Sequence, residues 1–567
     1  MKYLYLIQFY WLHRCYFIDI REMKTLKIKK SNKFMMLVIS VLVLSILYNT
    51  PVLANKDTVV IGTTDSIRNL DPSDAYDYFS SNTLVQITHG LMEMPVDSTD
   101  AVKGPIVDSF TVSDDATIYT FELKADIKFS DGEVFDADAM KWLLDRSVTL
   151  GGDPGFLLAD VIDNVVASGQ TLTINLSSPD ATFLQRLTYT VAWPVSPMSL
   201  EQNTIGGDPD SIPAGLGAYK ITSWTKGTEL IFETNPEYFG DAPQTDKIVV
   251  KFYTDASTLL TALESGEIDV AHKQFGPDEI ESITGNADLN SVTKETAGIR
   301  YLVLNVEKHT EVVVRQAIAA AVDRAAITST VFADLNEPIY TMVPKIFSSS
   351  KDSFEDGTLA QVTSLMEGAG YSSTNKYAMD FWYSPSHYGS EEIFVAELVR
   401  DQLEVTGFFD ITIKNTEWST YVGQFETMGF FLLGWWFDYP DPSNYIDPFA
   451  GAGAFSLGTN YTSTEMDGYI STMLTDTDPT ARANAQKSAQ DLMAEDVMTV
   501  PLFSMLKQFS GLQTTVTGYV LEPSENVHYN SIVVASDDDG GLPIGLFTST
   551  AIFLVISAGL MKLRRRN

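Results

Sequence analysis

The amino-acid sequence predicts an α/β protein built from more than one lobe, and three observations support this prediction. The chain has 567 residues, more than a single hydrophobic core usually organises. The stretch KIVVKFYTDASTLLTALESGEIDVA has the pattern of a strand at 248–252, a helix at 256–265 and a strand at 268–271. The same order returns in MDFWYSP, SEEIFVAELVRDQLEVTG and FDITIKNTEW. Strands that alternate with helices in this way predict sheets covered by helices.

The remaining elements follow from periodicity and from turn residues. Alternating apolar residues and β-branched runs indicate strands, whereas apolar residues three and four positions apart indicate helices. Asp136 is a plausible N-cap for a helix at 137–148. In chain order we expect a strand at 58–65, a helix at 82–94, a strand at 119–124, a helix at 137–148, a strand at 171–179, a hairpin over 215–240, a strand at 299–306, a helix at 311–327, a strand at 428–438 and a return strand within 498–511.

The stretch GWWFDYPDPSNYIDPF, residues 434–449, is an unusual loop. It holds three prolines, three aspartates and six aromatic residues. The prolines exclude both a continuous helix and a central strand. The loop follows an apolar strand, yet it is too aromatic for an ordinary solvated connection.

The charge distribution excludes one class of partner. The formal net charge is −36, and both ends are positive, so the middle of the chain carries about −46. Such a surface repels nucleic acid and anionic lipid headgroups. Nucleic acid is therefore not expected as a partner. The pattern is typical of a solvated surface outside a cell, and a surface that recruits a basic ligand is the alternative.

The N-terminal residues 1–54 have the pattern of an extension that ends in a secretory signal. Lysines precede the apolar run 34–47, and Ala54 is a plausible cleavage point. Translation from Met23 rather than Met1 would place the signal at the true N-terminus. A retained signal-anchor helix is the alternative. The only cysteine, Cys15, lies in this extension, so neither a disulfide within the chain nor a lipid anchor after Ala54 is expected.

The C-terminal residues have the pattern of a membrane anchor. An acidic linker at 536–541 leads into residues 542–567, in which an apolar run is followed by three arginines at 564–566. The sequence thus predicts a cell-surface protein, exported and tethered at its C-terminus. The alternative is a sorting signal whose apolar tail is removed after export.

No motif for catalysis or for a cofactor is present. The chain contains no HExxH, no GxSxG and no P-loop. The six histidines are scattered singly, so no metal site is predicted. We therefore expect a protein that is not an enzyme, and a surface hydrolase remains the less favoured alternative.

Five segments, in order, resemble one family. They are 106–146, with YTFELK and KFSDG; 212–240, with GLGAYK; ALESGEIDVA; VVRQAIAAAVDRAAI; and the loop 434–449. Together they are similar to the oligopeptide/dipeptide-binding family of extracellular solute-binding proteins of ABC importers. Leu216 and Ala218 depart from the usual Thr and Pro. The resemblance covers roughly residues 57–535.

The resemblance implies a two-lobed periplasmic-binding-protein-like α/β fold with an additional domain and a ligand cleft between the lobes. Mapped here, lobe I is discontinuous. The implied domains are 55–100, 196–302 and 505–535 for lobe I, 101–195 for the extra domain, and 303–504 for lobe II.

The resemblance also implies a binding site. Asp438 falls where peptide-binding members pair an aspartate with the ligand's α-ammonium. Trp435, Trp436 and Phe437 of the same loop would supply apolar walls, and Tyr439 is a further implied ligand-binding residue. The implied residues of the opposite lip are Tyr76, Tyr78 and His89. The alternative is that the tryptophans are core residues and Asp438 is a turn residue.

The implied function is capture of an oligopeptide and its delivery to the permease subunits of an ABC importer, whose ATPases are separate chains. The receptor would act as a monomer without a cofactor. The same role for an oligosaccharide or for a nickel or other metal chelate is the alternative.

Overall fold

Strands from distant parts of the chain form three main sheets in the computed structural model, which describes residues 56–535 except 206–210, 273–274, 386, 390 and 506–507. The predicted signal peptide at 1–54, the linker at 536–541 and the anchor at 542–567 lie outside the described residues. In the part of the chain that is described, no helix combines the length and the apolar character needed to cross a membrane.

The first sheet has seven strands in the order β12-β18-β11-β1-β10-β9-β8. Strand β1 lies between β10 and β11 and is parallel to both, as expected for the predicted strand–helix–strand unit. The predicted hairpin is the antiparallel pair β8 and β9. The strands are β1 (Thr58–Thr63), β8 (Tyr219–Thr225), β9 (Glu229–Thr234), β10 (Lys247–Phe252), β11 (Val270–His272), β12 (Leu289–Lys294) and β18 (Gln508–Gln513).

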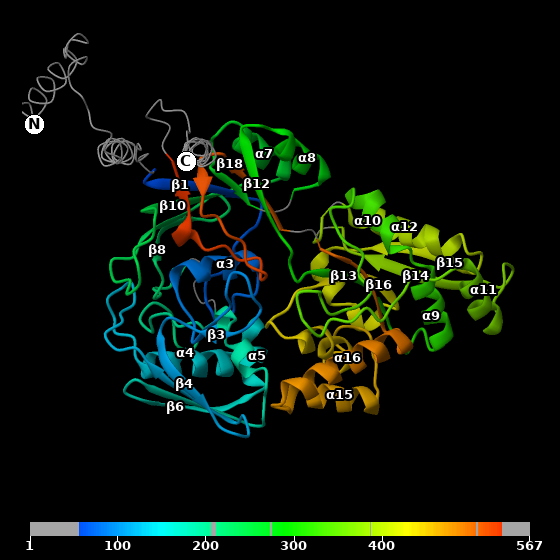
Figure 1. Ribbon diagram of the computed structural model, residues 1–567, viewed down its shortest axis with the longest axis horizontal. Helices are drawn as coiled ribbons and strands as arrows, with labels where there is room; N and C mark the ends of the chain where they lie inside the picture. Colours follow the sequence, from blue (N-terminus) through cyan, green and yellow to red (C-terminus); the bar gives the residue numbers. More distant parts are fainter. Residues whose placement is uncertain are drawn as a thin grey trace, which may run out of the picture. The chain divides into compact units, whose positions relative to one another are not determined.

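Helices cover both faces of this sheet (Figure 1). One face packs against α3 (Tyr78–Ile87) and the C-terminal segment that includes β19 (Val516–Thr517) and β20 (Val533–Val534). The other packs against α7 (Ala256–Glu264) and α8 (Pro277–Gly285). The N-cap Asp77 starts α3 earlier in the chain than the predicted helix at 82–94, and α3 also ends earlier than predicted, at Ile87.

The second sheet has five strands in the order β15-β14-β16-β13-β17. Along β13, Leu302 and Leu304 face one core, while Tyr301 and Val303 face another, so this strand is buried on both faces. The strands are β13 (Ile299–Leu304), β14 (Tyr377–Tyr383), β15 (Phe409–Asn415), β16 (Phe430–Trp435) and β17 (Thr499–Ser504).

Helices cover both faces of the second sheet as well (Figure 1). The first face carries α9 (Val312–Ala321), α10 (Arg324–Phe332), α11 (Leu359–Gly368) and α12 (Glu392–Glu404). The second face carries α15 (Thr464–Thr475) and α16 (Pro479–Asp496).

Two further elements differ from the prediction. The single helix expected at 311–327 is two helices, because the Asp323 carboxylate accepts a hydrogen bond from the Ala326 N–H at 2.8 Å and starts a new helix. The return strand expected within 498–511 is also divided. Its first half, β17, pairs with β13, and its second half, β18, pairs with β11 and β12 in the other sheet.

The third sheet has four antiparallel strands in the order β4-β5-β7-β6 and lies within the stretch predicted as the extra domain. Helices α4 (Ala137–Leu150) and α5 (Phe156–Ala159) pack on it. As predicted, Asp136 caps α4 and accepts from the Ala139 N–H at 3.0 Å. The strands are β4 (Val107–Val112), β5 (Ile118–Leu123), β6 (Ile162–Ser168) and β7 (Thr171–Leu176); the short pair β2 (Met92–Glu93) and β3 (Val102–Lys103) precedes them.

Candidate ligand-binding site

Strand β16 positions the aromatic loop. Its first five residues are buried, and it lies between β13 and β14. Pairing ends at Trp435, and the chain then enters the proline-containing segment. Within that segment Asp441 caps a short 3₁₀ helix at Pro442–Tyr445 by accepting from the Ser443 N–H at 2.9 Å. The loop is thus ordered by its own side chains at the end of a central strand.

Asp438 is a buried carboxylate, 9 % exposed. One carboxylate oxygen accepts a hydrogen bond from the Tyr76 hydroxyl, and the other accepts from the Asn444 side-chain amide at 3.3 Å. The Asp438 N–H in turn donates to Asn444 Oδ1 at 2.9 Å. Burial raises the pKa of Asp438, although these hydrogen bonds oppose that shift. No cation forms an ion pair with it among the residues that the structure describes.

Tyr76 reaches Asp438 from a segment 362 residues earlier in the chain. Its ring contacts Phe156 and Tyr189, with centroids 6.1 and 6.0 Å away. Although 38 % of the residue is exposed, desolvation of its hydroxyl, followed by the charge of Asp438, raises the pKa of Tyr76 well above its usual value, so the hydroxyl remains a hydrogen-bond donor at neutral pH. These two predicted site residues therefore lie together.

The two tryptophans have different surroundings. The Trp435 indole N–H donates to the Asn444 carbonyl at 2.8 Å, and its ring packs against Phe449 with centroids 5.1 Å apart. The Trp436 indole N–H donates to Glu525 Oε1 at 2.7 Å. The Trp436 ring stacks on Tyr388 with centroids 6.3 Å apart. Trp435 thus fixes the loop to the second sheet, whereas Trp436 extends to the C-terminal segment.

Tyr78 shares a hydrogen-bond partner, Glu525, with Trp436. Its hydroxyl contacts His272 Nε2 at 2.9 Å and Gln508 Nε2 at 3.2 Å, and it donates to the Glu525 carbonyl. Glu525 therefore links Tyr78 to Trp436. These contacts connect the start of α3 to the aromatic loop.

The two remaining predicted residues are placed differently. Tyr439 is 4 % exposed and lies under the Arg186 guanidinium, 4.6 Å from its ring. His89 contacts Glu93 at 2.7 Å and Tyr238 at 3.3 Å, and in the described part of the chain its partners do not include another predicted site residue. The structure therefore joins Tyr76, Asp438 and Trp435 through direct contact and Asn444. Glu525 joins Trp436 to Tyr78, and His89 belongs to neither group.

The sequence prediction did not include Arg300, which is 2 % exposed and pairs across the sheet with Gly434. Its Nη2 forms an ion pair with Glu392, and its guanidinium lies 3.6 Å from the Tyr388 ring centroid. Nε and Nη1 have no hydrogen-bond partner among the described residues. A charged residue inside the apolar stretch IRYLVLNV was a visible signal for this site.

The partners of the predicted residues were also missed. Asn444 lies within the loop 434–449, but its position six residues after Asp438 gave no indication that the two side chains would be hydrogen-bonded. No sequence pattern indicated Glu525. Among the described residues, no group of three or more His, Cys, Asp or Glu side chains could hold a metal ion.

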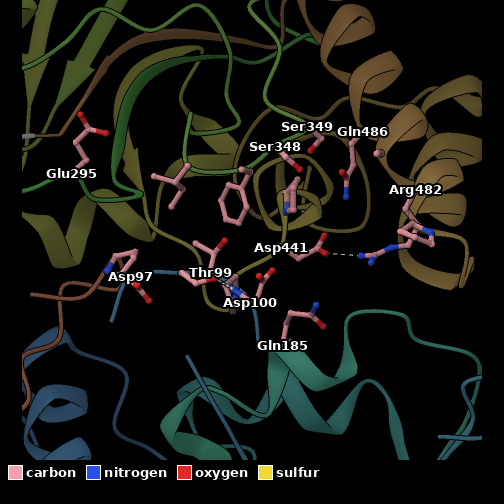
Figure 2. Close-up of a pocket in the computed structure, with 18 of the residues that line it drawn as sticks. Asp97, Thr99, Asp100, Gln185, Glu295, Ser348, Ser349, Asp441, Arg482 and Gln486 are labelled. Carbon is pink, nitrogen blue, oxygen red and sulfur yellow. Dashed lines mark hydrogen bonds and ion pairs between the residues drawn. The ribbon is translucent and has the colours of Figure 1, made fainter. Parts of the chain in front are cut away.

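A cavity of about 860 Å³ adjoins the loop where it continues past Asp438 (Figure 2). Pro440, Asp441 and Pro442 form one wall. The Asp441 carboxylate accepts from Arg482 Nη2 at 2.5 Å, and this ion pair fixes the wall to the start of α16. The same loop therefore carries Asp438 and one side of a cavity.

Two α/β sheets, each covered by helices on both faces, a separate four-stranded sheet and a buried loop carboxylate are consistent with the predicted two-lobed binding-protein fold. The family model for the middle region of the bacterial extracellular solute-binding proteins, family 5, matches residues 101–456. The chain belongs to this family, and the predicted family is confirmed.

Two curated relatives show how far the similarity extends. The glutathione-binding protein GsiB of Salmonella paratyphi A is 25 % identical over 498 residues, covering 85 % of this chain and 95 % of that protein. The dipeptide-binding protein of Escherichia coli K12 is 24 % identical over 486 residues, covering 79 % and 89 %.

Solved structures confirm the fold class. A dipeptide-binding protein from Pseudoalteromonas sp. SM9913, in complex with Met-Leu, gives a TM-score of 0.73 at 20 % identity and covers 84 % of this chain and 99 % of its own. NikA from Staphylococcus aureus, in complex with Ni(L-His)2, gives 0.69 at 18 % identity, with 84 % and 99 % covered. The family is one of solute-binding proteins and these relatives are named as binding proteins, so the prediction that the chain is not an enzyme is also confirmed.

Proposed function

We propose that this family 5 solute-binding protein captures oligopeptides outside the cell and delivers them to the permease of an ABC importer. The observation that carries the proposal is Asp438. A buried carboxylate without a cationic partner among the described residues is costly, and a peptide α-ammonium would supply that partner. The Tyr76 hydroxyl, from a segment 362 residues earlier in the chain, donates a hydrogen bond to this carboxylate.

Aromatic residues would surround the bound peptide. Trp436 and Tyr388 stack on each other close to the end of β16, and Tyr76 lies against Tyr189 and Phe156. Aromatic rings supply apolar contact area and faces that attract an ammonium group. The peptide- and glutathione-binding relatives support this class of ligand.

The test is a thermal-shift screen of the purified protein with free peptides, oligosaccharides and nickel–histidine complexes. A ligand that binds only the folded protein stabilises it by about 2.7 kcal/mol at a hundredfold excess over Kd. We expect a subset of peptides to raise Tm. A rise in Tm with sugars or with the nickel complex, and none with peptides, would favour an oligosaccharide or a metal chelate as the solute. The nickel-binding structural neighbour makes that second candidate specific.

The signal peptide and the C-terminal anchor complete the proposal. Residues 1–54 would direct export, and residues 542–567 would hold the receptor at the membrane beside its permease. The support for both segments is their sequence pattern, namely charged flanks beside apolar runs.

A further inference from the structure

The cavity beside the aromatic loop has walls from several separate parts of the chain. Figure 2 shows Asp97, Thr99 and Asp100 on one side, Gln185 below, and Ser348, Ser349 and Gln486 on the opposite side. Asp97–Asp100 follows β2, Gln185 lies in the short helix α6 (Phe183–Arg186), and Gln486 belongs to α16. An occupant would therefore touch segments associated with different sheets at once.

Buried polar side chains line this space. Ser349 is 3 % exposed, and its hydroxyl has no hydrogen-bond partner among the described residues. The side-chain oxygen of Gln185 is also unpartnered within the described chain. Figure 2 shows the Gln486 amide pointing from α16 into the cavity. Buried polar groups are normally hydrogen-bonded, so such a wall suits a polar occupant.

The charge of the cavity gives the sign of that occupant. Four carboxylates and two cations line it. Asp441 and Arg482 neutralise each other, and Lys294 donates to the Val96 carbonyl at 3.3 Å. Asp97, Asp100 and Glu295 form an exposed lip together with the Lys294 cation, so the four carboxylates and two cations leave the lining with a formal charge of −2.

We infer that this cavity receives a positively charged side chain of the bound peptide, a lysine or an arginine, and thereby gives the receptor a preference for basic peptides. The inference rests on the proposed peptide-binding function. A peptide anchored at Asp438 would run past Tyr439, and the wall at Pro440–Pro442 is the next part of the same loop. Lip carboxylates attract the charge, while the hydroxyl and amide groups hydrogen-bond to it.

The test uses the purified full-length chain and sets of alanine pentapeptides that carry lysine, norleucine or glutamate at each internal position. Norleucine keeps the length of the lysine stem but removes its charge. We expect one position at which lysine binds about tenfold tighter than norleucine, because exposed charge pairs each contribute a few-fold. Glutamate at that position should bind more weakly than either.

Two sets of variants test whether the lysine preference arises in the cavity. Asp97→Asn with Asp100→Asn should reduce the lysine preference to about twofold or less and leave the affinity for the norleucine peptide unchanged. The matched control, Asp108→Asn with Asp410→Asn, removes the same charge from exposed positions that do not line the cavity. It should retain the lysine preference.

The outcomes are separable. Peptide binding without a lysine preference at any position, or an equal loss of preference in the control pair, would overturn the assignment of the cavity and leave the peptide receptor intact. Absence of binding by every peptide would overturn both proposals.

Discussion

Asp438 is the residue on which the proposed peptide site depends. Asp438→Asn keeps the size and shape of the side chain but removes its charge, so a bound α-ammonium would lose its counter-ion. Loss of one partner of a buried charge pair costs about 2–5 kcal/mol, which is roughly a thirtyfold to several-thousandfold loss of affinity. Calorimetry with a free-amine peptide and its N-acetylated form measures this effect. The acetylated peptide should bind weakly to both proteins and show a much smaller difference between them.

A neighbouring aspartate provides the control for this prediction. Asp447 lies in the same loop, and burial raises its pKa as it does that of Asp438, but its carboxylate accepts from the Ala452 N–H rather than from Tyr76 or Asn444. Asp447→Asn should leave the preference for a free amine unchanged. Wild-type affinity in the Asp438→Asn protein would show that Asp438 is only a turn residue.

The residue scale also marks the limit of sequence reasoning. The sequence of the loop 434–449 pointed to Asp438. The contact between Asp438 and Tyr76 joins positions 362 residues apart, and no periodicity in the sequence indicates such a pair. Asn444 and Glu525 were missed for the same reason, since hydrogen bonds between loops depend on tertiary packing. His89 was grouped with the site by resemblance, whereas its partners here are Glu93 and Tyr238.

At the scale of elements, His309 joins β14 and α9 near the end of β13. Its ring contacts the Tyr377 hydroxyl at 2.8 Å, and its carbonyl accepts from Arg315 Nη1 at 2.6 Å. Burial, and then the charge of Arg315, lowers the pKa of His309 to about 4. Between that value and the ordinary 6.5, the unfolded chain binds a proton that the folded chain does not. Stability present above pH 6.5 is therefore lost as the pH falls towards 4.

The lowered pKa of His309 predicts that the folded protein loses stability as the pH falls. The shift corresponds to a free energy of unfolding on the order of 3 kcal/mol lost by the time the pH has fallen below 4. Urea unfolding at pH 7, 6, 5 and 4 measures the slope. His309→Gln should be less stable at pH 7 yet lose less stability on acidification. Parallel curves for the two proteins would contradict a neutral buried imidazole.

Local patterns predicted most elements but not their sheet partners. The predicted strand–helix–strand unit and the helix after Asp136 are present. The apolar run at 498–511 looked like one strand, because periodicity cannot show that β17 and β18 pair with different sheets. The helix at 311–327 looked continuous because its apolar spacing continues across the Asp323 cap.

At the scale of the whole molecule, the chain crosses repeatedly between the two large sheets, and side chains from distant segments meet at the aromatic loop. Tyr76 contacts Asp438, and Glu525 contacts Trp436. A peptide held at Asp438 would add further contacts among these segments. This is the physical basis for expecting ligand binding to stabilise the folded chain as a whole.

The last prediction concerns where the whole receptor resides. Residues 542–563 are apolar for about the length of a bilayer, and the arginines at 564–566 would remain on the cytoplasmic side. Deleting residues 542–567 should move the protein from the membrane fraction to the medium without changing its peptide affinity, because none of the proposed binding residues lies in that segment. Fractionation with immunodetection and intact mass measures both location and cleavage. A full-length, uncut wild-type protein already in the medium would contradict the anchor, whereas a shortened wild-type protein released from the membrane would identify the segment as a processed sorting signal.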